Sequence, residues 1–296
     1  MPNITTSERE LLGTLRFAQP AQQSLANQVT FYALKLNRIE TPTGMSQNQH
    51  RTESGSAAPT SGKNANVDIE LLRQRSVLFS ALSVEDAGTI IQLGRVVRHP
   101  AKHIVFQVGE SGDHLLILLE GRVKVSLTSA EGKEAILSIL EPGDVMGEMA
   151  LLDGETRSAT LTTMDACSFL VLWRRDFLPF LEQNPHVALK LLAGLSRRLR
   201  ATNDLVGNLS FLNLSARLAR ILINLGQQYG KLTSTGIAIG IKLSQEELGN
   251  LVGVSRESVN RQIRLWVEAG VLDYTHGTLT LKNSDVLFRE SLNSER

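Results

Sequence analysis

The chain has 296 residues, a length that fits two domains of roughly 100–200 residues each. Its 31 Lys and Arg residues nearly balance 30 Asp and Glu residues, which excludes a strongly basic nucleic-acid coat but allows a local basic surface. The single cysteine, Cys167, excludes an intrachain disulfide and a four-cysteine metal site, and favours the reducing cytoplasm. The longest purely apolar run, Leu115 to Leu119, is far below the ~20 residues of a membrane span, so no membrane partner is expected.

Residues 1–66 differ in composition from the rest of the chain. The stretch from Thr41 to Asn66 is rich in Pro, Gly, Ser, Thr, Gln and Asn and has almost no large apolar residue. Burial therefore cannot offset the entropy cost of ordering it. We expect a disordered tail, with weak helix between Leu11 and Leu36. The sequence leaves open whether translation starts at Met1 or at Met45.

Short strands are predicted from Arg95 to Trp173, inside a domain that we place at 67–184. Apolar runs alternate with Gly-containing turns, and short strands at such spacing predict an antiparallel sandwich or barrel. A short amphipathic helix from Ile69 to Leu82 precedes them. The predicted strands are Ile104–Val108, Leu115–Leu119, Val123–Leu127, Ala135–Leu140 and Phe169–Leu172.

A long helix is predicted beyond Pro185, within residues 185–212. Apolar residues recur there at alternating spacings of three and four, which favours a coiled-coil dimer seam over a helix packed only on its own domain. Thr202 is the one polar residue on the seam. We expect a hinge from Phe211 to Leu214, with Asn213 capping the next helix. The seam residues are Leu192, Leu195, Leu199, Thr202, Val206 and Leu209.

Residues 213–296 carry the pattern of a helix-turn-helix. Ser244, with Glu247 three residues later, forms a capping box, Gly253 allows a tight turn, and Ser255 caps a second helix that Gly270 ends. Such a pair of helices places the second one in the major groove of DNA. The turn signal His276-Gly277 between apolar segments predicts a small β wing. The apolar residues expected between the helices are Leu248, Val252, Val254, Val259 and Ile263.

The second helix carries side chains suited to reading bases. Arg256 and Arg261 can each donate two hydrogen bonds to guanine, and Glu257 can accept one from cytosine. The alternative is a solvated ion pair between Glu257 and Arg261. The predicted DNA-binding residues are Ser255, Arg256, Glu257, Asn260 and Arg261, with Arg264, Lys242 and Lys282 as phosphate contacts.

A second group of candidate functional residues, separate from those of the helix-turn-helix, lies between Pro142 and Thr160. Arg157 supplies a forked donor for phosphate oxygens, and the Ser158 hydroxyl with backbone N–H groups at a helix start completes an anion cradle. The Glu148 carboxylate can accept from a ribose 2′-hydroxyl, and Gly147 allows close backbone approach. This arrangement predicts an anionic sugar phosphate as ligand.

Together these motifs resemble the cyclic-AMP receptor protein and fumarate–nitrate regulator (Crp/Fnr) family of bacterial transcription factors, closest to its cyclic-AMP receptor branch. The resemblance covers roughly residues 72–283. It implies an α+β fold with a cyclic-nucleotide-binding β-roll of the double-stranded β-helix or jelly-roll type, a long dimerisation helix and a C-terminal winged helix-turn-helix. It rests on Gly109-Glu110, Leu119-Glu120-Gly121, the segment from Glu131 to Glu134, Gly143-Asp144 and the block from Gly147 to Thr160.

The resemblance also implies roles for single residues. Gly147 and Glu148 would meet the ribose of cyclic AMP, and Arg157 and Ser158 its cyclic phosphate. Thr202 would read the adenine base, with Asn203 arriving from the other subunit of a homodimer. Asn203 stands where cyclic-AMP receptor proteins often have Ser, but Asn can still donate and accept hydrogen bonds.

The family further implies partners. These are palindromic double-stranded DNA, with TGTGA and TCACA as half-sites, and RNA polymerase. The segment from Gly230 to Gly236 is expected as a loop where an activating surface would lie. The alternatives are a different effector, or DNA binding without one.

An enzyme is not expected, because the chain after Gly207 holds no nucleophile–base pair, metal-ligand cluster or Gly-rich phosphate loop. One cysteine cannot support iron–sulfur oxygen sensing. His99, His103 and His114 lie in the β region and are interpreted as surface or internally bonded residues, so no haem or metal site is predicted.

Overall fold

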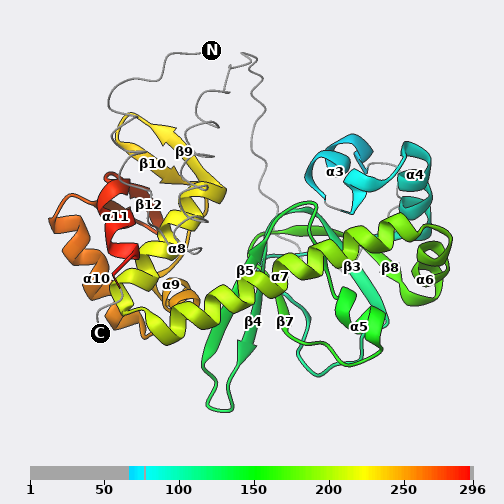
Figure 1. Cartoon of the computed structure of the whole chain (residues 1–296), viewed down its shortest axis with the longest axis horizontal. Coiled ribbons are helices and arrows are strands. Elements are labelled where there is room, and N and C mark those ends of the chain that lie inside the picture. Colours follow the sequence, from blue (N-terminus) through cyan, green and yellow to red (C-terminus); the bar gives the residue numbers. More distant parts are fainter. Residues whose placement is uncertain (1–66, 77, 294–296) are drawn as a thin grey trace, which may run out of the picture. The chain divides into compact units, whose positions relative to one another are not determined.

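The computed structural model describes residues 67–76 and 78–293 (Figure 1). The predicted tail over 1–66, with its weak helix and its alternative start, lies outside them. Among the described residues, no helix is both long and apolar enough to cross a membrane.

Two four-stranded antiparallel sheets form the β-roll, in the orders β1-β8-β3-β6 and β2-β7-β4-β5. This confirms the predicted antiparallel strands and adds β1, β6 and β7, which were not predicted. The strands are β1 Arg95–His99, β2 Ile104–Phe106, β3 His114–Glu120, β4 Val123–Thr128, β5 Glu134–Leu140, β6 Val145–Met146, β7 Thr160–Thr163 and β8 Cys167–Trp173.

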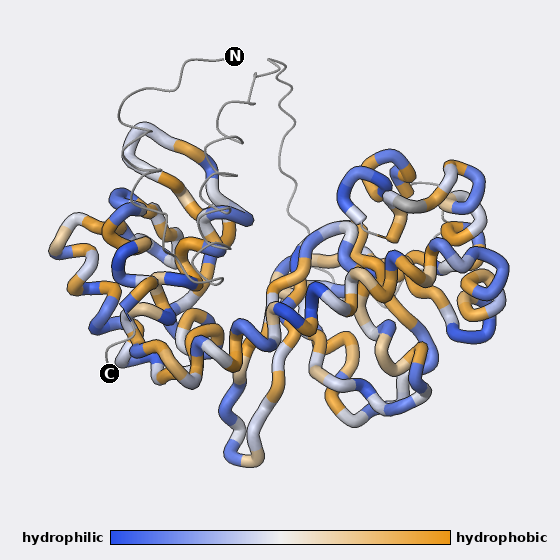
Figure 2. The backbone as a smooth tube through the Cα atoms, viewed as in Figure 1, coloured by the Kyte–Doolittle hydropathy of each residue, from blue (hydrophilic) through white to orange (hydrophobic). Residues whose placement is uncertain are grey.

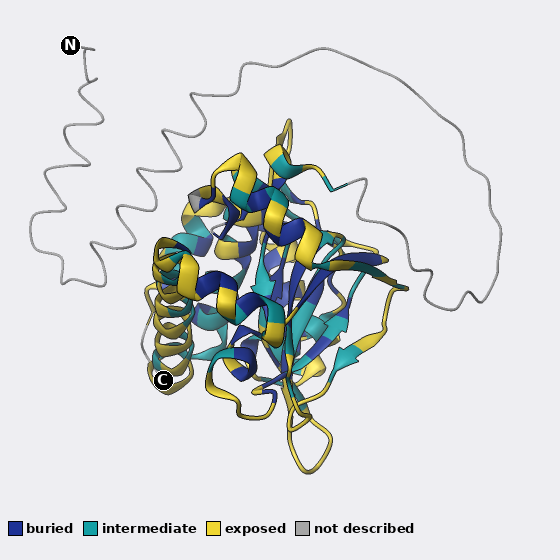
Figure 3. Ribbon diagram, turned by 90° about the vertical axis from the view of Figure 1, so that its right-hand side faces the viewer, coloured by how far each residue is buried: buried dark blue, intermediate teal, exposed yellow. Residues whose placement is uncertain are grey.

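Strands β3 and β8 are buried on both faces. Leu115 and Ile117 of β3 pack with the flanking helices, whereas Leu116 and Leu118 pack in a second cluster with strand residues such as Phe169. Successive side chains on a strand point to opposite faces, so a continuous apolar run fits a strand with a core on each side. Figure 2, in the view of Figure 1, shows these strands as largely hydrophobic, and Figure 3 shows buried strand segments in the interior of the described residues.

Helices flank this β-roll. The predicted single helix from Ile69 to Leu82 is wrong, because Ser76 adopts an extended backbone and ends the first helix at Arg75. The Phe79 N–H lies 3.5 Å from the Ser76 hydroxyl, where a separate turn begins. Helices α4 and α6 were not predicted. The elements are α3 Ile69–Arg75, the 3-10 turn η1 Phe79–Ala81, α4 Val84–Leu93, α5 Glu148–Asp153 and α6 Arg174–Gln183.

The long helix α7 spans Pro185–Phe211, as predicted from its apolar spacing. Four seam positions expose their side chains in the single chain: Leu192 by 56%, Leu199 by 63%, Val206 by 57% and Leu209 by 46%. Leu195 is half-buried. The helix ends at Phe211, within the segment predicted as a hinge, and the Asn213 side chain accepts a hydrogen bond from the Ala216 N–H at the start of the next helix.

The C-terminal part combines helices with a third four-stranded sheet, ordered β11-β12-β10-β9. The segment from Gly230 to Gly236, predicted as a loop, is instead largely strand: β9 pairs with β10 through Leu232 and Ile237. The elements are α8 Leu214–Tyr229, β9 Gly230–Thr233, β10 Gly236–Ile239, α9 Gln245–Val252, α10 Arg256–Glu268, β11 Leu272–Thr275, β12 Thr278–Leu281 and α11 Ser284–Ser291.

The helix-turn-helix is α9 and α10. Ser244 and Glu247 form the predicted capping box, and Gly253 adopts a left-handed conformation with φ of 75°. The Ser255 hydroxyl accepts from the Ser258 N–H at the start of α10. The predicted wing is also confirmed, because β11 and β12 pair across the His276-Gly277 turn. The five apolar residues predicted between the helices pack in one cluster: Leu248, Val252, Val254, Val259 and Ile263.

Candidate effector site and nucleic-acid interface

Arg157 lies buried in the β-roll, 2% exposed, just before β7. Its Nη1 donates to the carbonyl oxygens of His114 at 2.9 Å and Gly147 at 3.0 Å. Its Nη2 lies 3.2 Å from His114 Nε2, and its Cζ lies 4.4 Å from the centre of the Phe106 ring. The Nε atom is buried and has no hydrogen-bond partner among the described residues. These contacts hold the guanidinium in place, and its Nε–H donor has no acceptor among the described residues.

Two glycines make room for this guanidinium. Gly147 has a positive φ of 77°, and a methyl group there would collide with Arg157 Nη1. A methyl group at Gly112 would lie 2.9 Å from Arg157 Cζ. The Arg157 backbone is fixed by hydrogen bonds to and from Glu110 and Gly109, which explains the Gly109-Glu110 motif. Gly112 and Gly147 therefore leave the space that the Arg157 guanidinium occupies.

The charge of Arg157 has no direct counter-ion among the residues that the structure describes. No carboxylate forms an ion pair with it within residues 67–76 and 78–293. Burial lowers the pKa of Arg157, and the more distant negative charges of Asp113, Glu110 and Glu148 oppose that shift. A buried cation that is bonded only to neutral acceptors is costly, and an anion supplied by a ligand would remove that cost.

Glu148, at the start of α5, is buried and pairs with a residue that the sequence analysis missed. Arg198 on α7 donates to Glu148 Oε1 and to the Val145 carbonyl oxygen. Glu148 Oε2 is buried and has no partner among the described residues. Arg198 lies four residues before Thr202, on the same face of α7. This four-residue spacing from Thr202 is the feature of the sequence that could have indicated Arg198 as a site residue.

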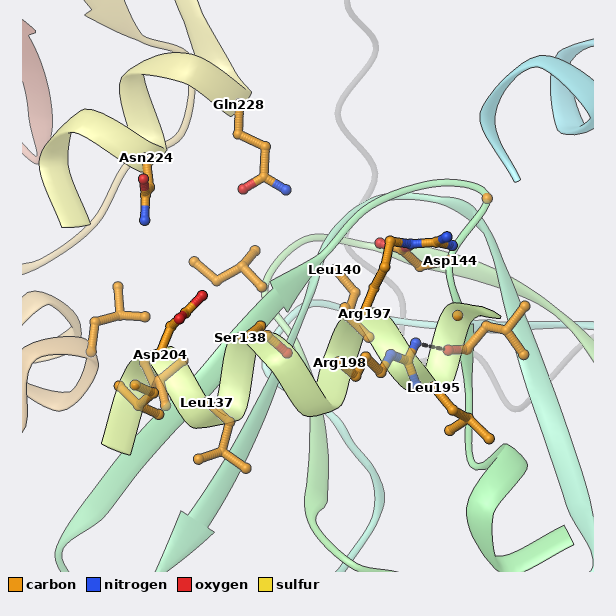
Figure 4. Close-up of a pocket in the computed structure, with 18 of the residues that line it drawn as sticks. Leu137, Ser138, Leu140, Asp144, Leu195, Arg197, Arg198, Asp204, Asn224 and Gln228 are labelled. Carbon is orange, nitrogen blue, oxygen red and sulfur yellow. Dashed lines mark hydrogen bonds between the residues drawn. The ribbon is translucent and has the colours of Figure 1, made fainter. Parts of the chain in front are cut away.

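A cavity of about 520 Å³ adjoins this ion pair (Figure 4). Glu148 and Arg198 line it together with residues of β5, α7 and α8. Figure 4 shows Ser138 of β5 and Asp204 of α7 among its side chains. Of the six predicted effector-site residues, Glu148 is the one that lines this cavity.

The structure brings together Gly147, Glu148 and Arg157, whereas the other three predicted effector residues are exposed. Ser158 is exposed, and its hydroxyl lies 3.6 Å from Met149 Sδ. Thr202 is exposed on α7, where its hydroxyl donates to the Arg198 carbonyl oxygen at 3.0 Å. Asn203 is exposed as well. The predicted base contacts by Thr202 and Asn203 remain predictions.

At the other end of the chain, α10 presents Arg256, Glu257 and Arg261 as exposed side chains. In the described part of the chain, no ion pair joins Glu257 to Arg261, so the alternative of a solvated pair is not what the structure shows. The Glu257 backbone N–H and the Ser255 hydroxyl lower the pKa of the Glu257 carboxyl. The carboxylate is therefore a hydrogen-bond acceptor at neutral pH.

Ser255 and Asn260 are engaged within the protein. The Ser255 hydroxyl caps α10, and the Asn260 side-chain oxygen accepts from Gln245 Nε2 at 3.1 Å. Lys282, a predicted phosphate contact, lies 3.6 Å from Asp273 on β11. The exposed cations Lys242 and Arg264 have no ion pair within residues 78–293.

Known proteins match both the β-roll and the helix-turn-helix part of the chain. A cyclic nucleotide-binding domain model matches residues 96–184, and a Crp-like helix-turn-helix domain model matches 216–289. The chain is 30% identical over 218 residues, 73% of its length and 94% of the relative's, to the CRP-like cAMP-activated global transcriptional regulator of Mycobacterium tuberculosis. The chain belongs to the Crp/Fnr family. The Escherichia coli cAMP-activated global transcriptional regulator CRP is 34% identical over 61% of this chain and 85% of that relative.

Solved structures of the family share this fold. The c-di-GMP responsive global regulator CLP of Xanthomonas campestris superposes with a TM-score of 0.62 at 23% identity, covering 67% of this chain and 99% of that one. A CooA variant from Carboxydothermus hydrogenoformans gives 0.62 at 24% identity, covering 73% and 95%. This member of the family is therefore a Crp-like DNA-binding transcription regulator with a cyclic-nucleotide-binding domain, and its curated relatives are regulators rather than enzymes.

Proposed function

We propose that this protein is a cytoplasmic transcription regulator that binds cyclic AMP in the β-roll and palindromic DNA as a homodimer. The observation that carries the effector assignment is Arg157, a buried guanidinium that has no direct counter-ion, and no partner for its Nε, among the described residues. A cyclic phosphate would supply the missing negative charge. The similarity to cAMP-activated regulators favours cyclic AMP over other cyclic nucleotides.

Glu148 is proposed as the acceptor for the ribose. Its Oε1 accepts from Arg198, whereas Oε2 is buried and has no partner in the described part of the chain, so one carboxylate can bind both Arg198 and the ribose. Arg198 would then couple the ligand to α7. Ligand binding would shift the population between two dimer arrangements, one of which holds the recognition helices about 34 Å apart, a single turn of DNA.

Calorimetric titration of the full chain with cyclic AMP, cyclic GMP and cyclic di-GMP tests this proposal. We expect saturable binding of cyclic AMP that is tighter than binding of the other two. If cyclic di-GMP binds more tightly than cyclic AMP, the effector is cyclic di-GMP and the assignment of cyclic AMP is wrong. The absence of binding by all three would leave a DNA-binding regulator without a cyclic-nucleotide effector. DNA binding, measured separately with and without the ligand, then decides whether the ligand acts on it.

Thr202→Ala is expected to reduce base discrimination. If Thr202 contacts the base, loss of its hydroxyl lowers the ratio of cyclic GMP to cyclic AMP dissociation constants by roughly threefold to tenfold, equivalent to one lost hydrogen bond. The ratio is measured by competition titration. Ser196→Ala removes another exposed hydroxyl from the same helix and serves as the control. An unchanged ratio in Thr202→Ala would remove Thr202 from the base-reading site.

Leu199→Asp is expected to dissociate the proposed dimer. Leu199 lies in the middle of the exposed α7 seam, and a carboxylate there would be buried without a partner at a subunit interface. Sedimentation equilibrium at micromolar protein should give a monomer for the variant and a dimer for the parent. Leu232→Asp, at a leucine on β9 that is 71% exposed, should remain dimeric. A parent that sediments as a monomer contradicts the homodimer.

A further inference from the structure

Met149, the second residue of α5, adjoins two residues of the proposed effector site. It directly follows Glu148, the proposed ribose acceptor. Its Sδ lies 3.6 Å from the hydroxyl of Ser158, which is nine residues away in the chain and is a predicted phosphate ligand. A thioether sulfur is a weak hydrogen-bond acceptor, so the hydroxyl can leave it for a stronger one.

The Met149 side chain is open to solvent. The residue is 46% exposed, whereas Met146 is 2% exposed and Met164 is half-buried. Cys167 is 3% exposed, and burial raises the pKa of its thiol, which keeps the thiol protonated and unreactive at neutral pH. Among the sulfur atoms of the described residues, Met149 Sδ is therefore the one that a small oxidant in solution reaches most readily.

Oxidation would turn this weak acceptor into a strong one. Hydrogen peroxide transfers one oxygen atom to Sδ: a sulfur lone pair forms the S–O bond and the O–O bond breaks. The proton of the transferred oxygen passes to the departing hydroxide, which leaves as water. The sulfur loses two electrons, the peroxide gains them, and the product is methionine sulfoxide. Its polar oxygen is one bond from the atom that the Ser158 hydroxyl contacts.

The sulfoxide oxygen and a cyclic phosphate would compete for the single proton of the Ser158 hydroxyl. A hydroxyl that donates to the sulfoxide does not donate to the phosphate, so the ligand loses one donor. Arg157 keeps its own contacts with the carbonyl oxygens of His114 and Gly147. Binding is therefore weakened rather than abolished.

We propose that Met149 is an oxidation site through which peroxides lower the affinity of the β-roll for cyclic AMP. The inference rests on the proposed binding of the cyclic phosphate by Arg157 and Ser158. The change is reversible, because methionine sulfoxide reductases return the thioether while a dithiol is oxidised to a disulfide and water is released.

Calorimetric titration of the full chain with cyclic AMP, before and after treatment with hydrogen peroxide, tests this inference. Peptide mass spectrometry measures the gain of one oxygen atom at Met149. For the parent, we expect a Kd about threefold to tenfold higher after oxidation, equivalent to the loss of about one hydrogen bond. Treatment with a methionine sulfoxide reductase should restore the original Kd.

Each variant is compared with itself before and after peroxide. Met149→Leu has no sulfur at this position, so its Kd should not respond. Met149→Gln carries a permanent side-chain oxygen, and its Kd should lie near that of the oxidised parent without any treatment. Ser158→Ala lacks the hydroxyl, so oxidation of Met149 should no longer change the Kd. Met164→Leu, at the half-buried methionine, is the control and should respond like the parent.

Failure of peroxide to oxidise Met149, or an unchanged Kd after its complete oxidation, overturns the inference while cyclic AMP binding stands. The same holds for a response that persists in Met149→Leu, since another residue then causes it. A response that persists in Ser158→Ala overturns competition for the hydroxyl. A parent that binds no cyclic AMP before treatment overturns the proposed effector and this inference together.

Discussion

Arg157→Ala is expected to weaken cyclic AMP binding by about 3 kcal/mol or more, a factor of roughly 100 or more in Kd. The substitution removes the forked, charge-assisted donor from a buried site and leaves the bound phosphate without a counter-ion. Titration of parent and variant under the same buffer conditions measures the loss. Equal affinities would refute the assignment of the phosphate to Arg157.

Because Arg157 also satisfies the carbonyl oxygens of His114 and Gly147, the alanine variant should be less stable as well. Thermal unfolding without ligand separates that effect from ligand binding. Arg157→Lys keeps the positive charge but loses the planar fork. It should fall between the parent and Arg157→Ala in affinity, and a lysine variant that binds as tightly as the parent would contradict forked recognition.

Glu257→Ala is expected to relax DNA specificity at one G·C pair of each half-site, by about 1–3 kcal/mol per half-site. The exposed, ionised carboxylate can accept from cytosine N4, and its loss removes that discrimination. Non-specific binding should change little, because the lost charge is negative and would lie near phosphates. Binding-site selection at fixed salt, with and without cyclic AMP, measures the change.

Glu268→Ala, at the other end of α10, is the matched control and should select the parent's consensus. If Glu257→Ala also selects the parent's consensus, Glu257 does not read DNA. An asymmetric consensus for the parent would argue against recognition by a symmetric dimer. A palindrome selected equally well without any nucleotide would keep the DNA-binding role and remove the effector mechanism.

The sequence alone determined the features that depend on neighbours in the chain. The capping box of Ser244 and Glu247, the Asn213 cap and the left-handed Gly253 are all local, since each side chain or backbone angle acts within a few residues. The apolar repeat of α7 and the continuous apolar run of β3 are likewise visible in the sequence. The prediction of a single helix from Ile69 to Leu82 was wrong because the helix ends at Ser76. The apolar spacing does not indicate that end.

Only the tertiary structure decided which distant residues meet at the candidate effector site. Arg198 reaches Glu148 across 50 positions in the sequence, and His114 reaches Arg157 across 43. The sequence separation of these residue pairs does not indicate the contacts, because the contacts result from strand pairing and from the packing of α7. For the same reason, the motif could indicate Arg157 as a phosphate donor but could not show that its charge lacks a counter-ion among the described residues. That depends on every side chain the fold gathers around it.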